Sequence, residues 1–182
     1  MAISAEDRAK LVQLARQTVR AEVAGLYPSP TGTLTGALAE RRGCFVTLTN
    51  KGRLRGCIGN FTPDRPLGEL VVRMASAAAR DPRFVTDPIR PEEVKDLTVE
   101  VSVLSPLQET AEPEKLQVGT HGIYVTCGGR AGCFLPEVAT DQGWDAEEFL
   151  ACCCAHKAAL PPDAWRRKDA KVYLFTSEKF DH

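Results

Sequence analysis

Two β-hairpin patterns constrain the fold of this 182-residue chain more than any other feature of its sequence. Short runs rich in β-branched and aromatic residues follow each other across glycine-containing turns, and they do not alternate regularly with helical patterns. The predicted strands are residues 44–49, 54–58, 97–104, 122–127, 133–135 and 171–176, with turns at 50–53 and 128–132. Because strands that pair through hairpins are antiparallel, the sequence predicts an α+β fold with a largely antiparallel sheet and flanking helices.

Apolar residues that recur every three or four positions predict three longer helices between these strands. Ser4, with Asp7 three residues later, has the spacing of a capping box, and Asp145 with Glu148 has the same spacing before the last helix. The predicted helices span residues 4–24, 67–79 and 145–160, a short helical turn covers 34–39, and residues 27–32 form a loop.

Composition bounds the class of protein. Hydrophobic residues make up 43% of the chain and charged residues 26%, which is ordinary for one globular domain or two closely fused lobes. The net charge of −1 gives no general reason to bind nucleic acid or an anionic membrane. No signal peptide or spanning segment is recognisable, so we expect a cytoplasmic protein whose seven cysteines are mostly reduced. Phosphate-loop and dinucleotide motifs are absent from the sequence, and we predict no cofactor.

The segment Leu54–Gly59 is the first candidate site. Gly56 and Gly59 flank Cys57, and glycine inside a strand marks a bulge or a place where another group comes close. Strand alternation puts Arg55 on the same face as the thiol, where a guanidinium would favour the reactive thiolate. The alternative is a buried cysteine that packs as a small hydrophobic side chain.

Four further features have both a functional and a structural interpretation. Glu100 lies within an apolar strand. It either acts as a general acid or base or lies on the solvent-exposed face of a sheet. His121 lies in a turn. It either takes part in proton transfer or is an ordinary surface histidine. Arg83 either contacts an anion or pairs internally with Asp81. The Cys152–Cys154 run offers too few ligands for a zinc site, so we predict no metal.

An ordered set of motifs resembles the AMMECR domain family, whose prokaryotic members are called AmmeMemoRadiSam system protein A. The motifs are Leu54–Gly59, Ala78–Phe84, Glu100–Leu104, Gly119–Tyr124, Leu135–Ala139 and Gly143–Asp145. The resemblance covers about residues 5–178 and implies one AMMECR-type domain over residues 1–182, made of two intertwined lobes without a linker. It also implies that Leu54–Gly59 lines a cleft between the lobes.

The resemblance implies a context but no established reaction. Family members occur beside a Memo-type protein and a radical SAM protein, which become the expected partners together with an unidentified small molecule. The residues that it singles out are Arg55, Gly56, Gly59, Asp81 and Arg83 for ligand binding, and Cys57, Glu100 and His121 for chemistry. Our leading hypothesis is a binding component of that system, which holds a polar or anionic group at Leu54–Gly59. The alternatives are a free-standing enzyme with Cys57 as nucleophile and Glu100 or His121 as base, and an RNA-binding or regulatory module.

Overall fold

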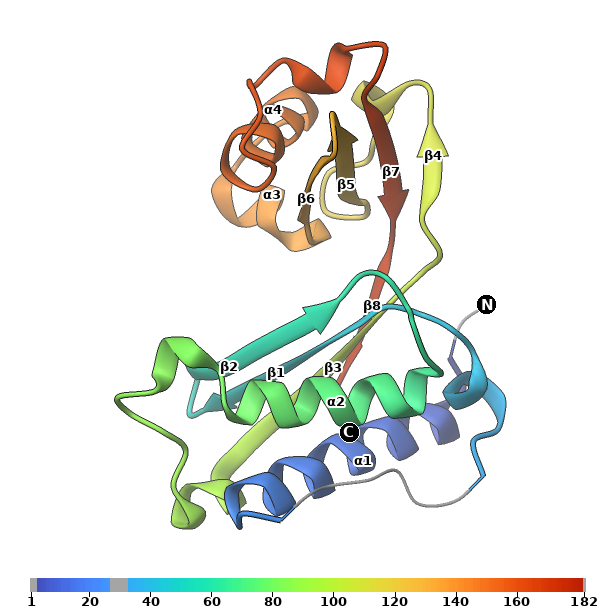
Figure 1. The fold of residues 1–182 in the computed structure, drawn as a ribbon. Helices are drawn as coiled ribbons and strands as arrows, with labels where there is room; N and C mark the ends of the chain where they lie inside the picture. Colours follow the sequence, from blue (N-terminus) through green and yellow to red (C-terminus); the bar gives the residue numbers. More distant parts are fainter. Residues whose placement is uncertain (1–2, 27–32, 182) are drawn as a thin grey trace. The chain divides into compact units, whose positions relative to one another are not determined.

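The computed structural model describes residues 3–26 and 33–181 of the chain, and the predicted loop at 27–32 lies outside the described residues. The chain divides into two compact units. The first unit comprises Met1–Leu104 and Glu178–His182, and the second comprises Ser105–Ser177. Each unit contains its own four-stranded antiparallel sheet, so the predicted α+β class is confirmed (Figure 1).

The sheet of the first unit has the strand order β2-β1-β3-β8, which leaves β2 at one edge. Its strands are β1 (Cys44–Asn50), β2 (Arg53–Asn60), β3 (Leu97–Leu104) and β8 (Ser177–Phe180). Helices α1 (Ala5–Val23) and α2 (Leu67–Ala79) cover one face of this sheet (Figure 1). Aliphatic side chains of β1 and β3 pack against both helices, including Val46, Leu48, Val99, Val101, Leu11, Val19, Leu70 and Val71.

Local signals placed the helices of this unit correctly. The Ser4 hydroxyl accepts a hydrogen bond from the Asp7 backbone N–H at the start of α1, and α2 has the predicted bounds. Three short 3-10 helices connect the longer elements. They are η1 (Gly36–Ala39), η2 (Pro82–Phe84) and η3 (Pro91–Asp96).

A register shift interrupts the pairing of β1 with β2. Leu48 pairs with Gly56 while the next residue, Thr49, pairs with Leu54, so Arg55 is an extra residue on β2. A β-bulge of this kind breaks the strict alternation of faces. The prediction that Arg55 and Cys57 share a face of the sheet relied on strict alternation, which the bulge at Arg55 interrupts.

The sheet of the second unit has the strand order β4-β7-β5-β6. Its strands are β4 (Gln108–Thr110), β5 (Gly122–Cys127), β6 (Arg130–Phe134) and β7 (Lys171–Phe175), and its helices are η4 (Pro113–Lys115), α3 (Pro136–Gln142), α4 (Ala146–His156) and η5 (Ala164–Arg166). Helix α4 begins with the predicted capping box between Asp145 and Glu148. Its buried face joins a core that includes Ile123, Val125, Phe149, Leu150 and Cys153.

Some bounds differ from the sequence prediction. The turn predicted for 128–132 is shorter, because Gly128 and Gly129 alone adopt positive φ angles of 56° and 77° and β6 begins at Arg130. Helix α4 ends at His156 rather than near residue 160. Strands β4 and β8 and helix α3 were not predicted, because segments of three to seven residues carry too few periods to stand out.

Both glycines of the Leu54–Gly59 segment permit a close approach from within the protein. A Cβ atom at Gly56 would lie 2.1 Å from the carbonyl oxygen of Ala78, in α2. A Cβ atom at Gly59 would lie 2.2 Å from ring atoms of Phe45. The room beside these glycines is therefore filled by the backbone of α2 and by an aromatic ring.

The replacement of Gly56 by alanine should destabilise the protein more than the replacement of Gly59. At Gly56 the obstacle is helix backbone that cannot move alone, and overpacking of this kind costs about 1–3 kcal/mol. At Gly59 the obstacle is the side chain of half-buried Phe45, which can turn. Denaturant titration of G56A and G59A measures both effects. A loss of stability in G59A equal to or greater than that in G56A would contradict this account.

Candidate functional site

Both backbone polar groups of Cys57 are bound by side chains of Asp81 and Arg83. Cys57 lies on the edge strand β2, and its N–H donates to Oδ2 of Asp81 at 3.0 Å. Its carbonyl oxygen accepts a hydrogen bond from Nη2 of Arg83 at 3.1 Å. Both backbone groups of Cys57 therefore point away from β1. The Asp81–Arg83 segment completes the edge of the sheet at this residue, where a further strand would otherwise pair.

Asp81 and Arg83 form one unit with this backbone. The carboxylate of Asp81 is fully buried and accepts from Nε of Arg83 at 3.0 Å and from Nη2 at 2.6 Å. These bonds, followed by those from the backbone N–H groups of Cys57 and Arg83, lower the pKa of Asp81 from 3.8 to about 2. The side chain of Arg83 is 57% exposed, and its Nη1 has no partner among the described residues. We call the Asp81–Arg83 ion pair, with its two hydrogen bonds to the Cys57 backbone, the clamp. Arg83 is the part of the clamp that reaches the surface.

The thiol of Cys57 lies beside Thr47. The two residues are directly opposite each other on β1 and β2, and Oγ1 of Thr47 is 3.3 Å from Sγ. Sequence reasoning missed Thr47, because its position opposite Cys57 depends on the register that the bulge sets. Cys57 is half-buried and lies on the sheet face opposite to Gly56 and α2.

Glu100 lies in the same row of the sheet but is not next to the thiol. It pairs with Thr47 from the other side, so two strand spacings, about 10 Å, separate its backbone from that of Cys57. Its carboxylate is 3.8 Å from Nζ of Lys179. A direct proton transfer between Glu100 and Cys57 therefore does not follow from the register.

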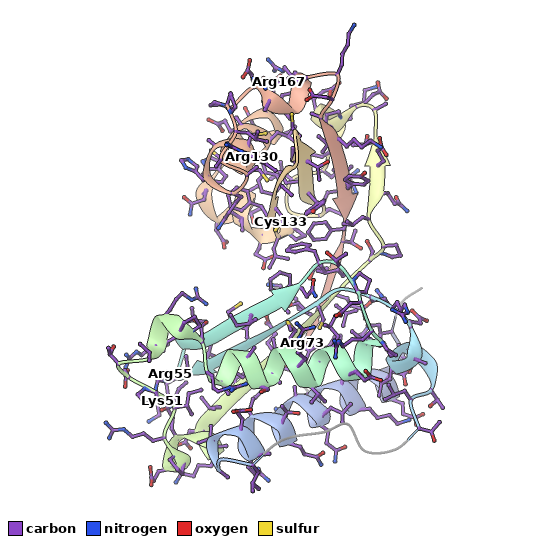
Figure 2. The ribbon with its side chains drawn as sticks, in the orientation of Figure 1. Lys51, Arg55, Arg73, Arg130, Cys133 and Arg167 are labelled. Atoms are coloured by element: carbon purple, nitrogen blue, oxygen red, sulfur yellow. The ribbon has the colours of Figure 1, made fainter. Side chains whose placement is uncertain are left out.

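Arg55 is buried and fully engaged within the first unit. Only 3% of its side chain is exposed, and Nε donates to Glu93 at 2.6 Å while Nη1 contacts Asp87 at 3.1 Å. The hydrogen bonds with Arg55 are the main cause that lowers the pKa of Glu93. Arg55 lies at the start of β2 near Lys51 (Figure 2). This arrangement corrects the expectation that the guanidinium of Arg55 activates the Cys57 thiol, because the guanidinium is bound by the carboxylates of Glu93 and Asp87.

The remaining candidates lie in the second unit. Nδ1 of His121 accepts a hydrogen bond from the backbone N–H of Gln117 at 3.0 Å, which leaves Nε2 to carry the proton of the neutral ring. Cys153 and Cys154 are buried in the core under α4. Within residues 3–26 and 33–181, no group of three His, Cys, Asp or Glu side chains could hold a metal ion. All seven cysteines are free thiols.

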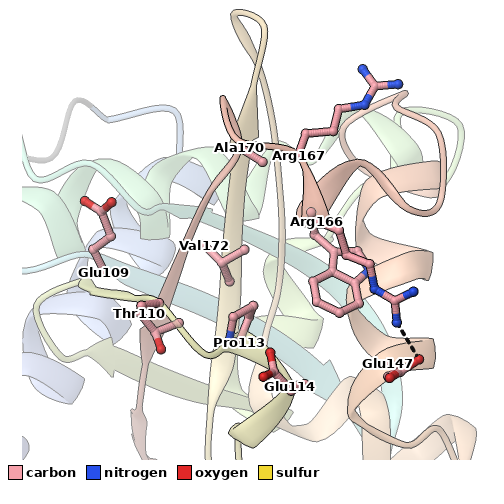
Figure 3. A pocket seen from close by; sticks show the side chains of 11 residues that line it. Glu109, Thr110, Pro113, Glu114, Glu147, Arg166, Arg167, Ala170 and Val172 are labelled. Carbon is pink, nitrogen blue, oxygen red and sulfur yellow. Dashed lines mark hydrogen bonds and ion pairs between the residues drawn. The ribbon is translucent and has the colours of Figure 1, made fainter.

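A hollow of about 620 Å³ in the second unit was not predicted from the sequence. It forms where β4 ends at Thr110 and the chain turns into η4, opposite η5 (Figure 3). The guanidinium of Arg166 lies 4.4 Å from the centre of the Trp165 ring and 2.7 Å from Glu147. Glu109, Glu114 and Arg167 also line the hollow, so it presents charges of both signs. Such a lining suits a polar ligand that carries both charges.

These features define an α+β protein of two units, each with a four-stranded antiparallel sheet, in which side chains from the loop after α2 fix a half-buried thiol on an edge strand. The profile of the AMMECR1 family matches residues 12–180. The chain belongs to the AMMECR1 family, as its motifs indicate. Of the described helices, none is both long enough and apolar enough to cross a bilayer.

Similar proteins cover nearly the whole chain. A protein of Methanothermobacter thermautotrophicus is 41% identical over 98% of this chain and 95% of its own length. Protein TK0174 of Thermococcus kodakarensis is 44% identical over 94% of this chain and 88% of its own. The crystal structure of protein PH0010 from Pyrococcus horikoshii has a TM-score of 0.84 at 42% identity, and the match covers 97% of this chain and 92% of that one.

The Asp81 clamp should make the free energy of unfolding depend on pH in the acid range. Because the folded-state pKa of about 2 lies below the ordinary value of 3.8, the clamp stabilises the protein above about pH 4. This contribution, about 2 kcal/mol, is lost as the pH falls from 4 to 2. Urea titration should therefore show D81N less stable than the natural chain at pH 6 and nearly equal to it at pH 2. The matched control D96N removes an exposed carboxylate with no partner among the described residues. Its stability relative to the natural chain should be the same at pH 6 and at pH 2. A constant gap between D81N and the natural chain across this range would contradict the clamp.

The half-buried thiols should differ in alkylation. Cys57 and Cys133 are both half-buried, but burial raises the pKa of Cys133 to about 11, so roughly 0.1% of it is thiolate at pH 8. Burial also raises the pKa of Cys44 to about 12. With iodoacetamide at pH 8, peptide mass spectrometry should find Cys57 modified before Cys133 and Cys44. Equal rates at Cys57 and Cys133 would count against an available thiol.

Proposed function

We propose that this protein is a cytoplasmic binding component of a radical SAM/Memo-linked modification system, and that it binds a polar or anionic group at Cys57 and Arg83. Cys57 supplies the thiol on the face of the first unit's sheet. Arg83 supplies the charge at the sheet edge.

The observation that carries this proposal is the clamp on the Cys57 backbone. Asp81 and Arg83 fix the N–H and the carbonyl of Cys57, so the backbone position of this residue is set by two bonds that do not involve the sulfur. Thr47 then places a hydroxyl 3.3 Å from Sγ. Binding sites depend on groups whose positions are fixed before the ligand arrives, because that arrangement lowers the entropy cost of binding.

Arg83 supports the anionic character of the ligand. Its Nε and Nη2 are engaged by Asp81, but more than half of its side chain is exposed and Nη1 has no partner among the described residues. A guanidinium that is already oriented by a buried carboxylate loses less freedom when it binds a second anion. Arg55, by contrast, has no comparable exposure and plays no part in this proposal.

The partners come from the family context. The family resemblance points to a Memo-type protein and a radical SAM protein, and the seven free thiols suit a reducing compartment. A free-standing enzyme would need a base beside Cys57, and the residue in that position is Thr47 rather than Glu100. Within the first unit, this geometry favours binding over catalysis by Cys57 and Glu100.

Removal of the Cys57 thiol should weaken binding of these partners. Isothermal titration should give a measurable Kd for the Memo-type or the radical SAM protein of the same organism. C57A should raise that Kd about tenfold or more, the loss expected from one good contact in an interface. The variant keeps the clamp, because neither clamp bond uses the side chain, so the fold is retained.

The matched control is C152A, which removes another half-buried thiol on helix α4. It should leave the Kd unchanged. If neither partner binds, the assignment to this system is wrong. If they bind C57A and the natural chain equally, the role of the thiol is wrong.

A further inference from the structure

A second site emerges on the first unit, where the C-terminal half of α1 meets η3 and the start of β3 (Figure 1). These elements surround a hollow of about 250 Å³. Its apolar lining consists of Val19, Val94, Leu97 and Val99. Its polar lining consists of three cations, namely Arg16, Arg20 and Lys95. No carboxylate is among the lining residues in the described part of the chain.

The three cations have no ion pair with a carboxylate of residues 3–26 or 33–181. Nη2 of Arg16 donates to the backbone carbonyl of Asp181 at 2.8 Å, which orients the guanidinium without cancelling its charge. The side chains of Arg20 and Lys95 have no hydrogen bond or ion pair with another described residue. Elsewhere on α1, by contrast, Arg8 pairs with Glu178 and Lys10 with Glu6.

This arrangement costs stability in the absence of an anion. Arg16 and Arg20 are four residues apart on one helix, and like charges at that spacing repel each other. The helix dipole favours a cation in the last turn, which accounts for Arg20 at the end of α1 and for Lys95 at the end of η3. It does not account for Arg16, or for the convergence of cations from two different elements on the same hollow.

We propose that this hollow binds a phosphate monoester that carries a short apolar group. Two guanidiniums and an ammonium match a dianionic phosphate better than a singly charged carboxylate, because guanidinium binds phosphate through two parallel hydrogen bonds. Half-buried Val94 and Leu97 receive the apolar group, above the buried side chains of Val19 and Val99. No aromatic side chain lines the hollow, so the site offers no stacking platform for a nucleotide base. Its volume suits a small ligand rather than a drug-sized one.

Calorimetric titration with n-butyl phosphate tests this site. The natural chain should bind it more tightly than inorganic phosphate, because only the ester also buries apolar surface. R20Q and K95Q should each weaken binding about tenfold, as expected for the loss of one charge-assisted hydrogen bond. The matched control is K168Q, which removes an exposed cation of the second unit and should leave the affinity unchanged.

Two further measurements separate this role from others. In the absence of ligand, R20Q should unfold at nearly the same temperature as the natural chain, because the repulsion from Arg16 that it removes offsets the helix-dipole interaction that it loses. A merely structural arginine would give a lower value. Vesicles with phosphatidic acid, compared with pure phosphatidylcholine vesicles, show whether a lipid headgroup is the source of the phosphate. Binding of either probe that is lost in R20Q and K95Q supports the proposal. Failure of both probes to bind, or equal binding by the variants, overturns it.

Discussion

The contact between Gly56 and Ala78 is the constraint on which the first unit's candidate thiol site depends. It allows the C-terminal end of α2 to lie directly against the edge strand β2, because no side chain keeps the two backbones apart. A larger residue at Gly56 would push the helix outward. The loop that follows α2 would move with it, and so would every group that this loop carries to the sheet.

The clamp follows from this close approach. Asp81 comes two residues after the last residue of α2, so a helix end that lies against Gly56 brings its carboxylate to the N–H of the next residue, Cys57. Arg83 then neutralises the buried carboxylate and bonds the carbonyl of the same residue. A buried carboxylate without its arginine would be strongly unfavourable, so the two side chains act together. Packing and electrostatics thus fix one backbone position from two directions.

The sequence predicted what depends on local pattern and missed what depends on register. The bounds of α2 and β3 follow from periodicity alone, and the caps at Ser4 and Asp145 follow from short-range hydrogen bonding. The glycines of Leu54–Gly59 indicated a bulge or a close approach, but the position of the bulge at Arg55 depends on how β1 pairs with β2. The same pairing places Thr47, not Glu100, beside the thiol. The hollow between α1, η3 and β3 combines residues more than 70 positions apart, and no local pattern connects them.

The structure accounts for nearly every unusual residue of the Leu54–Gly59 segment except the sulfur. Gly56 admits the helix, Gly59 admits the ring of Phe45, and Arg55 neutralises Glu93. The clamp bonds reach only the backbone of Cys57, so alanine or serine could occupy that position without the loss of either. A thiol that the fold does not require, at a position that the fold holds on both sides, is the part of this segment left for function.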